Sequence, residues 1–439
     1  MSFPRYERYK DSEYSSYGAI PADWREVRLK TVLSQRITDG PHETPAFTVS
    51  GVPFLSVDGI QAGELVFEGC RYISQEAHAL YARKVQPKRD DILLAKAAST
   101  GKVARVKTDI EFNIWSPLAV IRLASDRALP AFVEYVLQSP QAQAQIDNLC
   151  TANTQKNISM DDIPLLFFTL PSMEEQMSIV EFLSRETAKI DGLIEEQRRL
   201  IELLKEKRQA VISHAVTKGL NPNAPMKDSG MEVLGKIPSH WNCGPLKHFA
   251  KVIDCKHVTV EFVDTGRPIV SIRELKNDRI ELNEAKLANE EEWEFLREGR
   301  VPATGDLIIC RNASVGAVGE VTSGMEFCMG QDVCLIRPSI PGGFDFFTLI
   351  SGVVRQQIDA LLVGATIRRL NVEAIRGLIV ADPPKGERSE IAQYLNLEVK
   401  KCDALETEAI GAIGLLQERR SALISAAVTG KIDVRGIAQ

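Results

Sequence analysis

Two polar segments of the chain carry side chains suited to contact with nucleic acid. Residues 151–157 read Thr-Ala-Asn-Thr-Gln-Lys-Asn, and glutamine and asparagine amides can form paired hydrogen bonds with adenine in the major groove. Residues 364–371 read Gly-Ala-Thr-Ile-Arg-Arg-Leu-Asn, and their two arginines suit guanine or phosphate. Either segment could instead be a solvated loop. The candidate contacts are Thr154, Gln155, Lys156, Asn157, Thr366, Arg368, Arg369 and Asn371.

Two glycine-containing loops have the composition of phosphate contacts. Residues 96–102 and 311–316 combine cationic side chains with small residues, whose backbone N–H groups can donate to phosphate oxygens. The alternative is again a pair of solvated loops without a ligand. The candidate residues are Lys96, Ser99, Thr100, Lys102, Arg311, Asn312 and Ser314.

Two Asp-x-x-His pairs invite a catalytic interpretation. They are Asp39 with His42, followed by Thr44, and Asp254 with His257. No nucleophile pattern accompanies either pair, so general acid–base catalysis is disfavoured. Both aspartates lie in apparent turns, which favours a turn-stabilising carboxylate beside a partly buried histidine. A DNA-facing role is the alternative, and it makes Asp39, His42, Thr44 and His257 candidate contacts.

Motifs for cofactor chemistry are incomplete in this sequence. Asp382-Pro-Pro resembles the base-holding motif of adenine methyltransferases, but Lys385 replaces the aromatic residue that stacks on the flipped base. Residues 314–319 do not complete a dinucleotide-binding glycine pattern, and no Walker A sequence occurs. We therefore expect no catalytic residue and no S-adenosylmethionine or ATP site in this chain.

Composition limits the remaining classes of protein. The eight cysteines form no C-x-x-C pair or zinc-ligand spacing, which predicts reduced thiols, most of them buried, and no metal site. The first ten residues lack the apolar core of a signal peptide, and no run is apolar enough to cross a membrane, so we expect a cytoplasmic protein. The net charge of −6 weighs against nucleic-acid binding, unless the basic groups are gathered locally.

An internal repeat organises these residues. Gly18-x-Ile-Pro-x-x-Trp24 recurs as Gly235-x-Ile-Pro-x-x-Trp241 in the middle of the chain. The two Asp-x-x-His pairs are separated by nearly the same interval, as are the two glycine loops. The pattern of residues 191–217 recurs in residues 403–429. Because the order is collinear and the offset changes little, the chain is one architecture built twice.

Each repeat begins with a mixed globular part. Short apolar runs broken by Gly, Pro and Asp predict strands of a mixed sheet, and helical stretches are expected at residues 131–146 and 344–362. The fold class is therefore α/β (mixed α+β). The predicted divisions are an N-terminal extension 1–17, a first globular domain 18–171, a first helix 172–218, a linker 219–234, a second globular domain 235–384, a second helix 385–430 and a tail 431–439.

Each repeat ends in a long amphipathic segment with apolar residues at imperfect heptad spacing. The segment predicts a coiled-coil helix. Since the second domain passes directly into the second helix, that helix is expected to run back beside the first, antiparallel to it. The two domains would then be related by an approximate twofold axis.

The duplicated pattern resembles the specificity subunits of type I restriction-modification systems. The likeness covers nearly the whole chain and lies in the ordered set of motifs. These are the two Gly-x-Ile-Pro-x-x-Trp blocks, residues 39–44 and 51–56, Asp91-Ile-Leu with Ser99-Thr-Gly101, the Asn157 and Asn371 segments, and the paired helices.

The resemblance implies that each globular domain is a target-recognition domain reading half of a bipartite double-stranded DNA site. The helices would set the spacing and dock two methyltransferase subunits, to which two restriction/translocase subunits can be added. S-adenosylmethionine, ATP and Mg would belong to those partners. Two alternatives remain open, namely a methyltransferase with degenerate motifs and a duplicated coiled-coil scaffold that binds proteins rather than DNA.

Overall fold

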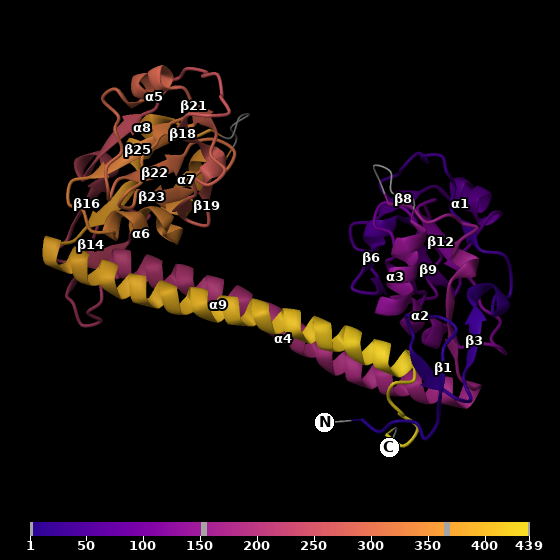
Figure 1. The fold of residues 1–439 in the computed structure, drawn as a ribbon. Coiled ribbons are helices and arrows are strands. Elements are labelled where there is room, and N and C mark those ends of the chain that lie inside the picture. Colours follow the sequence, from indigo (N-terminus) through magenta and orange to yellow (C-terminus); the bar gives the residue numbers. More distant parts are fainter. Residues whose placement is uncertain (1–2, 151–155, 364–368, 438–439) are drawn as a thin grey trace. The chain divides into compact units, whose positions relative to one another are not determined.

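The computed structural model describes residues 3–150, 156–363 and 369–437. It forms two compact units: unit 1 comprises residues 1–197 and 411–439, and unit 2 comprises residues 198–410. Both units mix strands and helices, which confirms the expected α/β class (Figure 1). The long helices α4 (Met173–Lys218) and α9 (Lys385–Val428) are each divided between the units. The functional domain boundaries remain a prediction, since each unit combines a globular part with portions of both helices.

The central sheet of unit 1 has four antiparallel strands. Their order is β10 (Val103–Arg105), β9 (Ile92–Ala95), β12 (Leu118–Ile121) and β4 (Thr38–Asp39). Strand β9 is apolar throughout because both of its faces are covered. Ile92 and Leu94 join the core shared with the helices, whereas Leu93 and Ala95 join a second core on the opposite face. A smaller sheet contributes to the second side, with the order β11 (Asn113–Ile114), β5 (Val52–Leu55) and β8 (Arg71–Ile73).

Unit 2 has the same sheet plan. Its four-stranded sheet has the order β17 (Ala250–Asp254), β25 (Val333–Pro338), β22 (Leu307–Cys310) and β23 (Val318–Glu320). Its smaller sheet has the order β21 (Leu287–Ala288), β18 (Arg267–Val270) and β24 (Cys328–Met329). Alternate residues of β22 again enter two different cores: Leu307 and Ile309 one, Ile308 and Cys310 the other. Equivalent sequence segments therefore form equivalent strands in the two units.

Each predicted helical stretch is two short helices joined at a serine. Residues 131–146 fall in α2 (Pro130–Gln138) and α3 (Pro140–Leu149), and residues 344–362 in α6 (Phe344–Ile350) and α7 (Gly352–Leu362). The side chains of Ser139 and Ser351 accept hydrogen bonds from the first turns of α3 and α7. Because an N-cap residue has extended backbone geometry, each serine ends one helix and starts the next.

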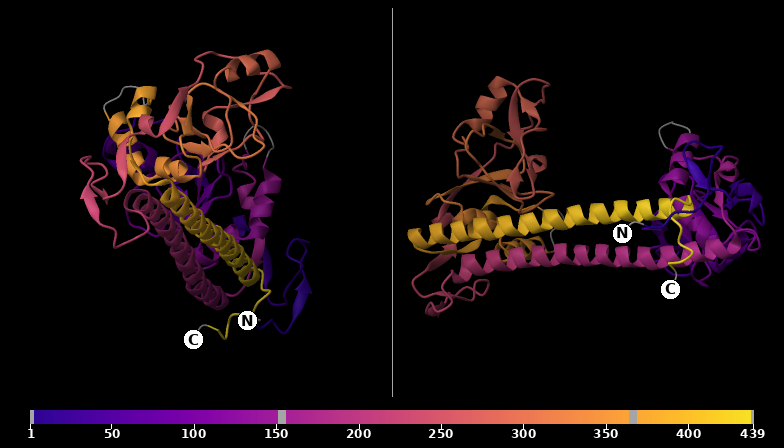
Figure 2. Two further views of the ribbon diagram at one scale, coloured as in Figure 1. Left: turned by 90° about the vertical axis from the view of Figure 1, so that its left-hand side faces the viewer. Right: turned by 60° about the horizontal axis from the view of Figure 1, so that its bottom comes forward.

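The Ile-Pro-x-x-Trp motif receives the end of a long helix in each unit. Trp24 and Trp241 are almost fully buried. Gly430, just after α9, packs so closely on Pro21 that an added Cβ would lie 2.3 Å from its Cδ, and Gly219, just after α4, contacts Trp241 in the same way at 3.1 Å. Both glycines have positive φ, the usual geometry of a residue that follows a helix. Figure 2 shows both long helices as unbroken coils from two further sides.

The segments predicted as extension, linker and tail take part in the units. Strand β1 (Tyr9–Asp11) pairs with β2 (Ala19–Pro21), and β14 (Met226–Asp228) pairs with β15 (Lys236–Pro238). Val434 is buried in the core of unit 1. Strands β3 (Arg25–Arg28) and β13 (Phe167–Leu170) pair in unit 1, as do β16 (Asn242–Pro245) and β26 (Ile379–Asp382) in unit 2.

The eight cysteines are unpaired, and five of them are buried. Within the described ranges, no helix is both long enough and apolar enough to cross a membrane.

Candidate nucleic-acid interface

The two predicted glycine loops are hairpin connections of the same geometry. One joins β9 to β10 and the other joins β22 to β23. Ala98 and Ala313 have left-handed backbone conformations, with φ of 66° and 53°. Gly101 and Gly316 also have positive φ, and each donates its N–H to the carbonyl of the last residue of the preceding strand at 2.9 Å. The sequence folds this way because glycine tolerates the conformation that the tight return requires.

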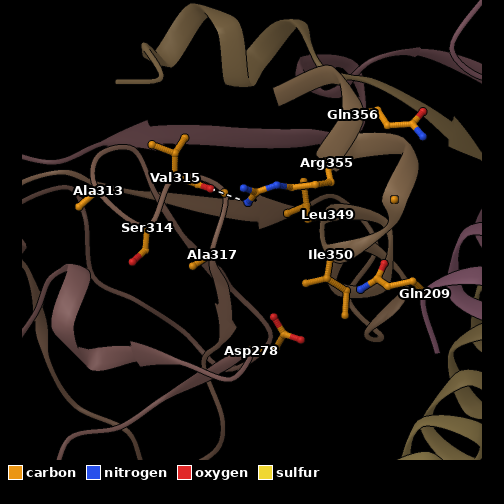
Figure 3. Close-up of a pocket in the computed structure, with 12 residues that line it drawn as sticks. Gln209, Asp278, Ala313, Ser314, Val315, Ala317, Leu349, Ile350, Arg355 and Gln356 are labelled. Carbon is orange, nitrogen blue, oxygen red and sulfur yellow. Dashed lines mark hydrogen bonds between the residues drawn. The ribbon is translucent and has the colours of Figure 1, made fainter. Parts of the chain in front are cut away.

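In each unit, a helix side chain donates a hydrogen bond to a backbone carbonyl of the glycine loop. In unit 1, Gln143 of α3 donates from Nε2 to the carbonyl of Gly101 at 2.9 Å. In unit 2, Arg355 of α7 occupies the repeat position and donates from Nη1 to the carbonyl of Val315 at 2.8 Å (Figure 3). A hollow of about 550 Å³ lies beside this second loop, and Gln209 of α4 and Asp278 also line it (Figure 3).

The structure brings each glycine loop against the second predicted segment of the same unit. In unit 1, Ile158 donates its backbone N–H to the carbonyl of Lys96 at 2.9 Å, and Thr100 Oγ1 donates to the carbonyl of Lys156 at 2.7 Å. In unit 2, Leu370 donates its backbone N–H to the carbonyl of Arg311 at 2.8 Å. The sequence therefore identified two neighbouring parts of one surface in each unit.

Four predicted contacts lie outside the described residues. They are Thr154, Gln155, Thr366 and Arg368. Two described residues that follow them, Asn157 and Arg369, lie beside the glycine loops through bridges to Ala97 and Asn312.

Asp39 is the centre of an ion cluster in unit 1. Its carboxylate lies 2.6 Å from Lys84 Nζ, 3.2 Å from Lys96 Nζ and 3.1 Å from His42 Nε2. Burial alone would raise the pKa of Asp39, but the hydrogen bonds and charges of the two lysines outweigh it and lower the pKa. Lys96 is largely buried in this cluster, so the structure gives it an internal partner in place of an open phosphate-facing position. Lys84 belongs to no sequence motif and is distant from Asp39 along the chain.

Asp254 is the equivalent centre in unit 2. Arg311 Nη1 lies 2.6 Å from its Oδ1, and His257 Nε2 lies 3.1 Å from its Oδ2. Burial would raise the pKa of Asp254, whereas the hydrogen bond from His257 and the charge of Arg311 lower it. Arg311 is buried and also donates from Nε to the carbonyl of Leu370 at 3.0 Å. Arg311 therefore ties the glycine loop to the strand end and to the second segment.

The predicted turns at the aspartates are wrong. Asp39 ends β4 and pairs with Ala119, and Asp254 ends β17 and pairs with Cys334. Polar residues at the ends of these strands resemble a turn in the sequence. Their pairing partners lie about 80 residues further along the chain, so local sequence does not reveal the strand. The histidines are also more exposed than expected, with 70% of the His42 side chain and 54% of the His257 side chain accessible.

The other predicted DNA contacts differ in their exposure and in their partners within the protein. Lys102, Thr44 and Ser314 are exposed. Arg369 pairs with Asp332 at 3.0 Å and remains 44% exposed. Asn371 is the N-cap of α8 (Val372–Gly377), where its Oδ1 accepts from the backbone N–H of Ala374 at 2.7 Å. That bond gives Asn371 a structural role, which the sequence did not anticipate.

Exposed apolar and aromatic side chains follow the aspartate clusters, and none of them belongs to a predicted motif. In the loop after β4, Val49 is fully exposed and Phe47 lies under the Arg71 guanidinium, 4.6 Å from its ring centroid. In the loop after β17, Phe262 is half-exposed under Lys286 Nζ at 3.7 Å.

The loop after β17 is joined to the segments that carry Arg311 and Arg369. Gln331 Nε2 donates to Thr259 Oγ1 at 3.2 Å, and the next residue, Asp332, pairs with Arg369. Asp332 also accepts the backbone N–H of Arg311 through its carbonyl. The surface thus combines cations, backbone donors and aromatic rings, a set that suits phosphates, base edges and unstacked bases.

Comparison with known proteins gives consistent matches. Residues 21–203 match the family model "Type I restriction modification DNA specificity domain". The EcoBI specificity subunit of Escherichia coli is 25% identical, and the match spans 45% of this chain and 42% of that protein, under half of each. The EcoKI specificity subunit of Escherichia coli strain K12 is 20% identical over 96% of this chain and 91% of that protein.

A solved structure has the same fold. It comes from work on complex assembly and conformational transition of the type I R-M system, and it superposes with a TM-score of 0.63 at 17% identity. The superposition covers 93% of this chain and 98% of the other.

Proposed function

The chain belongs to the specificity subunits of type I restriction-modification systems, and we propose that it recognises a bipartite double-stranded DNA target, one half with each unit. Members of this family are non-catalytic, so the chemistry would reside in associated subunits. The observation that carries the proposal is the repeated surface. In each unit, a glycine loop, a polar segment and an Asp–His pair from distant parts of the sequence lie together.

Two copies of one surface with different side chains suit a target with two different halves. Unit 1 presents Lys102 and Asn157, whereas unit 2 has Ala317 at the repeat position of Lys102 and Arg369 at the place of Asn157. Phosphate contacts orient a protein on the duplex, and contacts with base edges select the sequence. The two units would therefore share a binding mode and differ in the bases they select.

The long helices are proposed to set the distance between the two half-sites. Both pass from one unit into the other without a break. In unit 1, Arg420 Nε donates to Asp191 Oδ1 at 2.9 Å, and in unit 2, Arg208 Nε lies 3.9 Å from Asp403 Oδ1. In both pairs the arginine and the aspartate come from different helices. These contacts, together with the buried heptad residues Leu183, Ile190, Ile194 and Leu204, support an antiparallel coiled coil with twofold pseudo-symmetry.

Exposed leucines on the helices support two equivalent docking surfaces for methyltransferase subunits. Leu193 and Leu405 are repeat equivalents, as are Leu203 and Leu415, and all four are at least 46% exposed. Each unit contains one leucine of each pair, so each unit offers the same two apolar side chains. Exposed apolar groups of this kind mark protein interfaces. Two restriction/translocase subunits would join this complex, and S-adenosylmethionine, ATP and Mg would bind the partners.

The testing experiment is co-expression with a type I methyltransferase partner in a host free of adenine methylation, followed by genome-wide mapping of methylated adenine. We expect a split motif with two defined halves around a gap of fixed length. An assembled, cofactor-competent complex that methylates no defined motif would contradict the proposal and favour the protein-binding scaffold.

A domain exchange tests which unit reads which half. Replacing residues 18–171 with the corresponding domain of another specificity subunit should change one half of the motif and leave the other half unchanged. A change in both halves would contradict the division of recognition between the units. Inserting whole helical turns into both α4 and α9 should lengthen only the gap.

A further inference from the structure

Three groups with metal-binding chemistry meet at the end of β17 in unit 2. One ligand atom each of Asp254, Cys255 and His257 lies within 4.8 Å of the other two. Cys255 Sγ is 3.8 Å from His257 Nδ1, and His257 Nε2 is 3.1 Å from Asp254 Oδ2. Cysteine spacing alone did not predict this group, because only one of its members is a cysteine.

A second thiol lies next to the group. Cys334 belongs to β25, directly opposite Asp254 in the strand register, and its Sγ lies 3.5 Å from Asp254 Oδ1. Cys255 and Cys334 are buried, whereas His257 is half-exposed. The group is therefore open to solvent on the histidine side and closed on the thiol side.

We propose that Asp254, Cys255 and His257 bind a divalent transition-metal ion of the zinc type, with Cys334 as the adjacent thiol that can complete the ligand set. Thiolate, imidazole and carboxylate are the ligands that zinc takes in proteins. Zinc–ligand bonds of about 2.0–2.3 Å place tetrahedral ligands roughly 3.3–3.8 Å apart. One ligand atom from each of the three residues lies within 4.8 Å of the other two, so small side-chain rotations would bring them to a common ion through one ring nitrogen of His257. Arg311, 2.6 Å from Asp254, supplies positive charge that offsets a thiolate and a carboxylate.

The equivalent aspartate–histidine pair of unit 1 lacks both thiols. Asp39 and His42 lie 3.1 Å apart, as do Asp254 and His257, but Gly40 and Ala119 occupy the repeat positions of the two cysteines. A Cβ at Gly40 would lie 2.0 Å from the carbonyl oxygen of Ile114, so no cysteine fits there.

The two aspartates also differ in the number of cationic side chains around them. Asp39 has two lysine partners, Lys84 and Lys96. In unit 2, Arg311 takes the place of Lys96, while Gly299 stands at the repeat position of Lys84. The next residue, Arg300, donates from Nε to the backbone carbonyl of Asp254 and from Nη1 to that of Glu298. The ion would supply the second positive charge, and it would fix the entrance of the loop that leads to Thr259.

The test is metal binding by the purified full-length chain, or by its complex with the methyltransferase. After loading with Zn²⁺ and dialysis, we expect one zinc per chain by elemental analysis. Co²⁺ should give tetrahedral d–d bands and a thiolate charge-transfer band. Cys255→Gly, which installs the unit 1 residue, and His257→Ala should each weaken Co²⁺ binding at least tenfold. Cys328→Ala, which removes another buried thiol of unit 2, should leave binding unchanged.

Circular dichroism establishes that each variant is folded. Folded wild-type protein that retains no zinc, or a Co²⁺ spectrum without a thiolate band, would overturn the proposal. Equal binding by wild type and Cys255→Gly would overturn it as well. Metal content is measured without DNA, so the result does not depend on the target-recognition function.

Discussion

The side chains of Asp39 and Lys96 form a largely buried ion pair, with Nζ 3.2 Å from Oδ2. The aspartate ends β4 and the lysine follows β9, so the pair joins two strands that are not adjacent in the sheet. Both residues are candidate DNA contacts from the sequence, and the structure links them to each other. Their first role is therefore to hold the glycine loop against the sheet edge.

Asp39→Asn should destabilise unit 1, because it leaves two lysines near a neutral group. Removing one partner of a buried charged hydrogen bond costs roughly 2–3 kcal/mol. The pKa of Asp39 is lowered in the folded protein, so its contribution to stability is present above the unfolded-state pKa and is lost as pH falls through the folded-state pKa. The difference between wild type and variant, measured by denaturant unfolding, should be full at neutral pH and shrink below about pH 4. A difference that is constant across this range would contradict the ion-pair explanation.

Much of the local structure could be predicted because it depends on short-range patterns. The fully apolar runs around Leu93 and Ile308 predicted strands, and both are strands covered on both faces. The glycines at 101 and 316 predicted loops, and both have positive φ. The repeat also predicted that the two glycine loops are equivalent, and the structure places the first residue of each loop, Lys96 and Arg311, on equivalent aspartates.

Contacts between distant segments could not be predicted from the same patterns. Nothing near Lys84 indicates that it reaches Asp39, because that contact depends on how α1 (Gln75–Ala82) and the sheet pack. Asn371 looked like a base contact because its amide suits adenine, but the same amide also suits a helix N-cap. A polar side chain has several satisfactory partners, and only the fold decides between them.

Arg311→Ala should destabilise unit 2 more than Arg369→Ala does. Arg311 is buried and bonds to both Asp254 and the Leu370 carbonyl, so its loss leaves Asp254 with His257 but no buried cation, at a cost of about 2–3 kcal/mol. Arg369 is 44% exposed, and its removal should leave the thermal midpoint nearly unchanged while it weakens DNA binding. Thermal unfolding of both variants checks the comparison. Equal losses of stability would contradict the structural role of Arg311.

Gly101→Ala should be more harmful than Gly69→Ala. Both glycines have positive φ, which costs a non-glycine residue about 1–2 kcal/mol. At Gly101 the new Cβ would also lie 2.4 Å from Gln143 Oε1, whereas at Gly69 no atom lies within 4 Å. The Gly101 variant must displace the side chain that supports the loop, so it should lose DNA affinity as well as stability. Calorimetry and binding assays measure the two effects, and an equal loss of stability in both variants would show that the support is not needed.

Lys102→Ala should weaken binding of the assembled complex to all duplexes alike. Lys102 is exposed beside the glycine loop, where a phosphate contact carries no sequence information. Its loss should reduce the slope of log affinity against log salt by about one unit and leave stability unchanged. Lys205→Ala, an exposed lysine of α4, is the control and should not alter the slope. A loss confined to the specific target would instead indicate that Lys102 contacts a base.

Leu193→Glu and Leu405→Glu should each remove one of two methyltransferase subunits from the complex. The two leucines are repeat equivalents, one in each unit, and both are 46% exposed, so a charge there should spare the core while it disfavours an apolar interface. Each single variant should bind one subunit by native mass spectrometry, and the double variant should bind none. Leu220→Glu tests a similarly exposed leucine just beyond the end of α4 and should keep both subunits. If both single variants retain two subunits, the partners do not dock on these leucines, and the proposed twofold arrangement of docking surfaces is wrong.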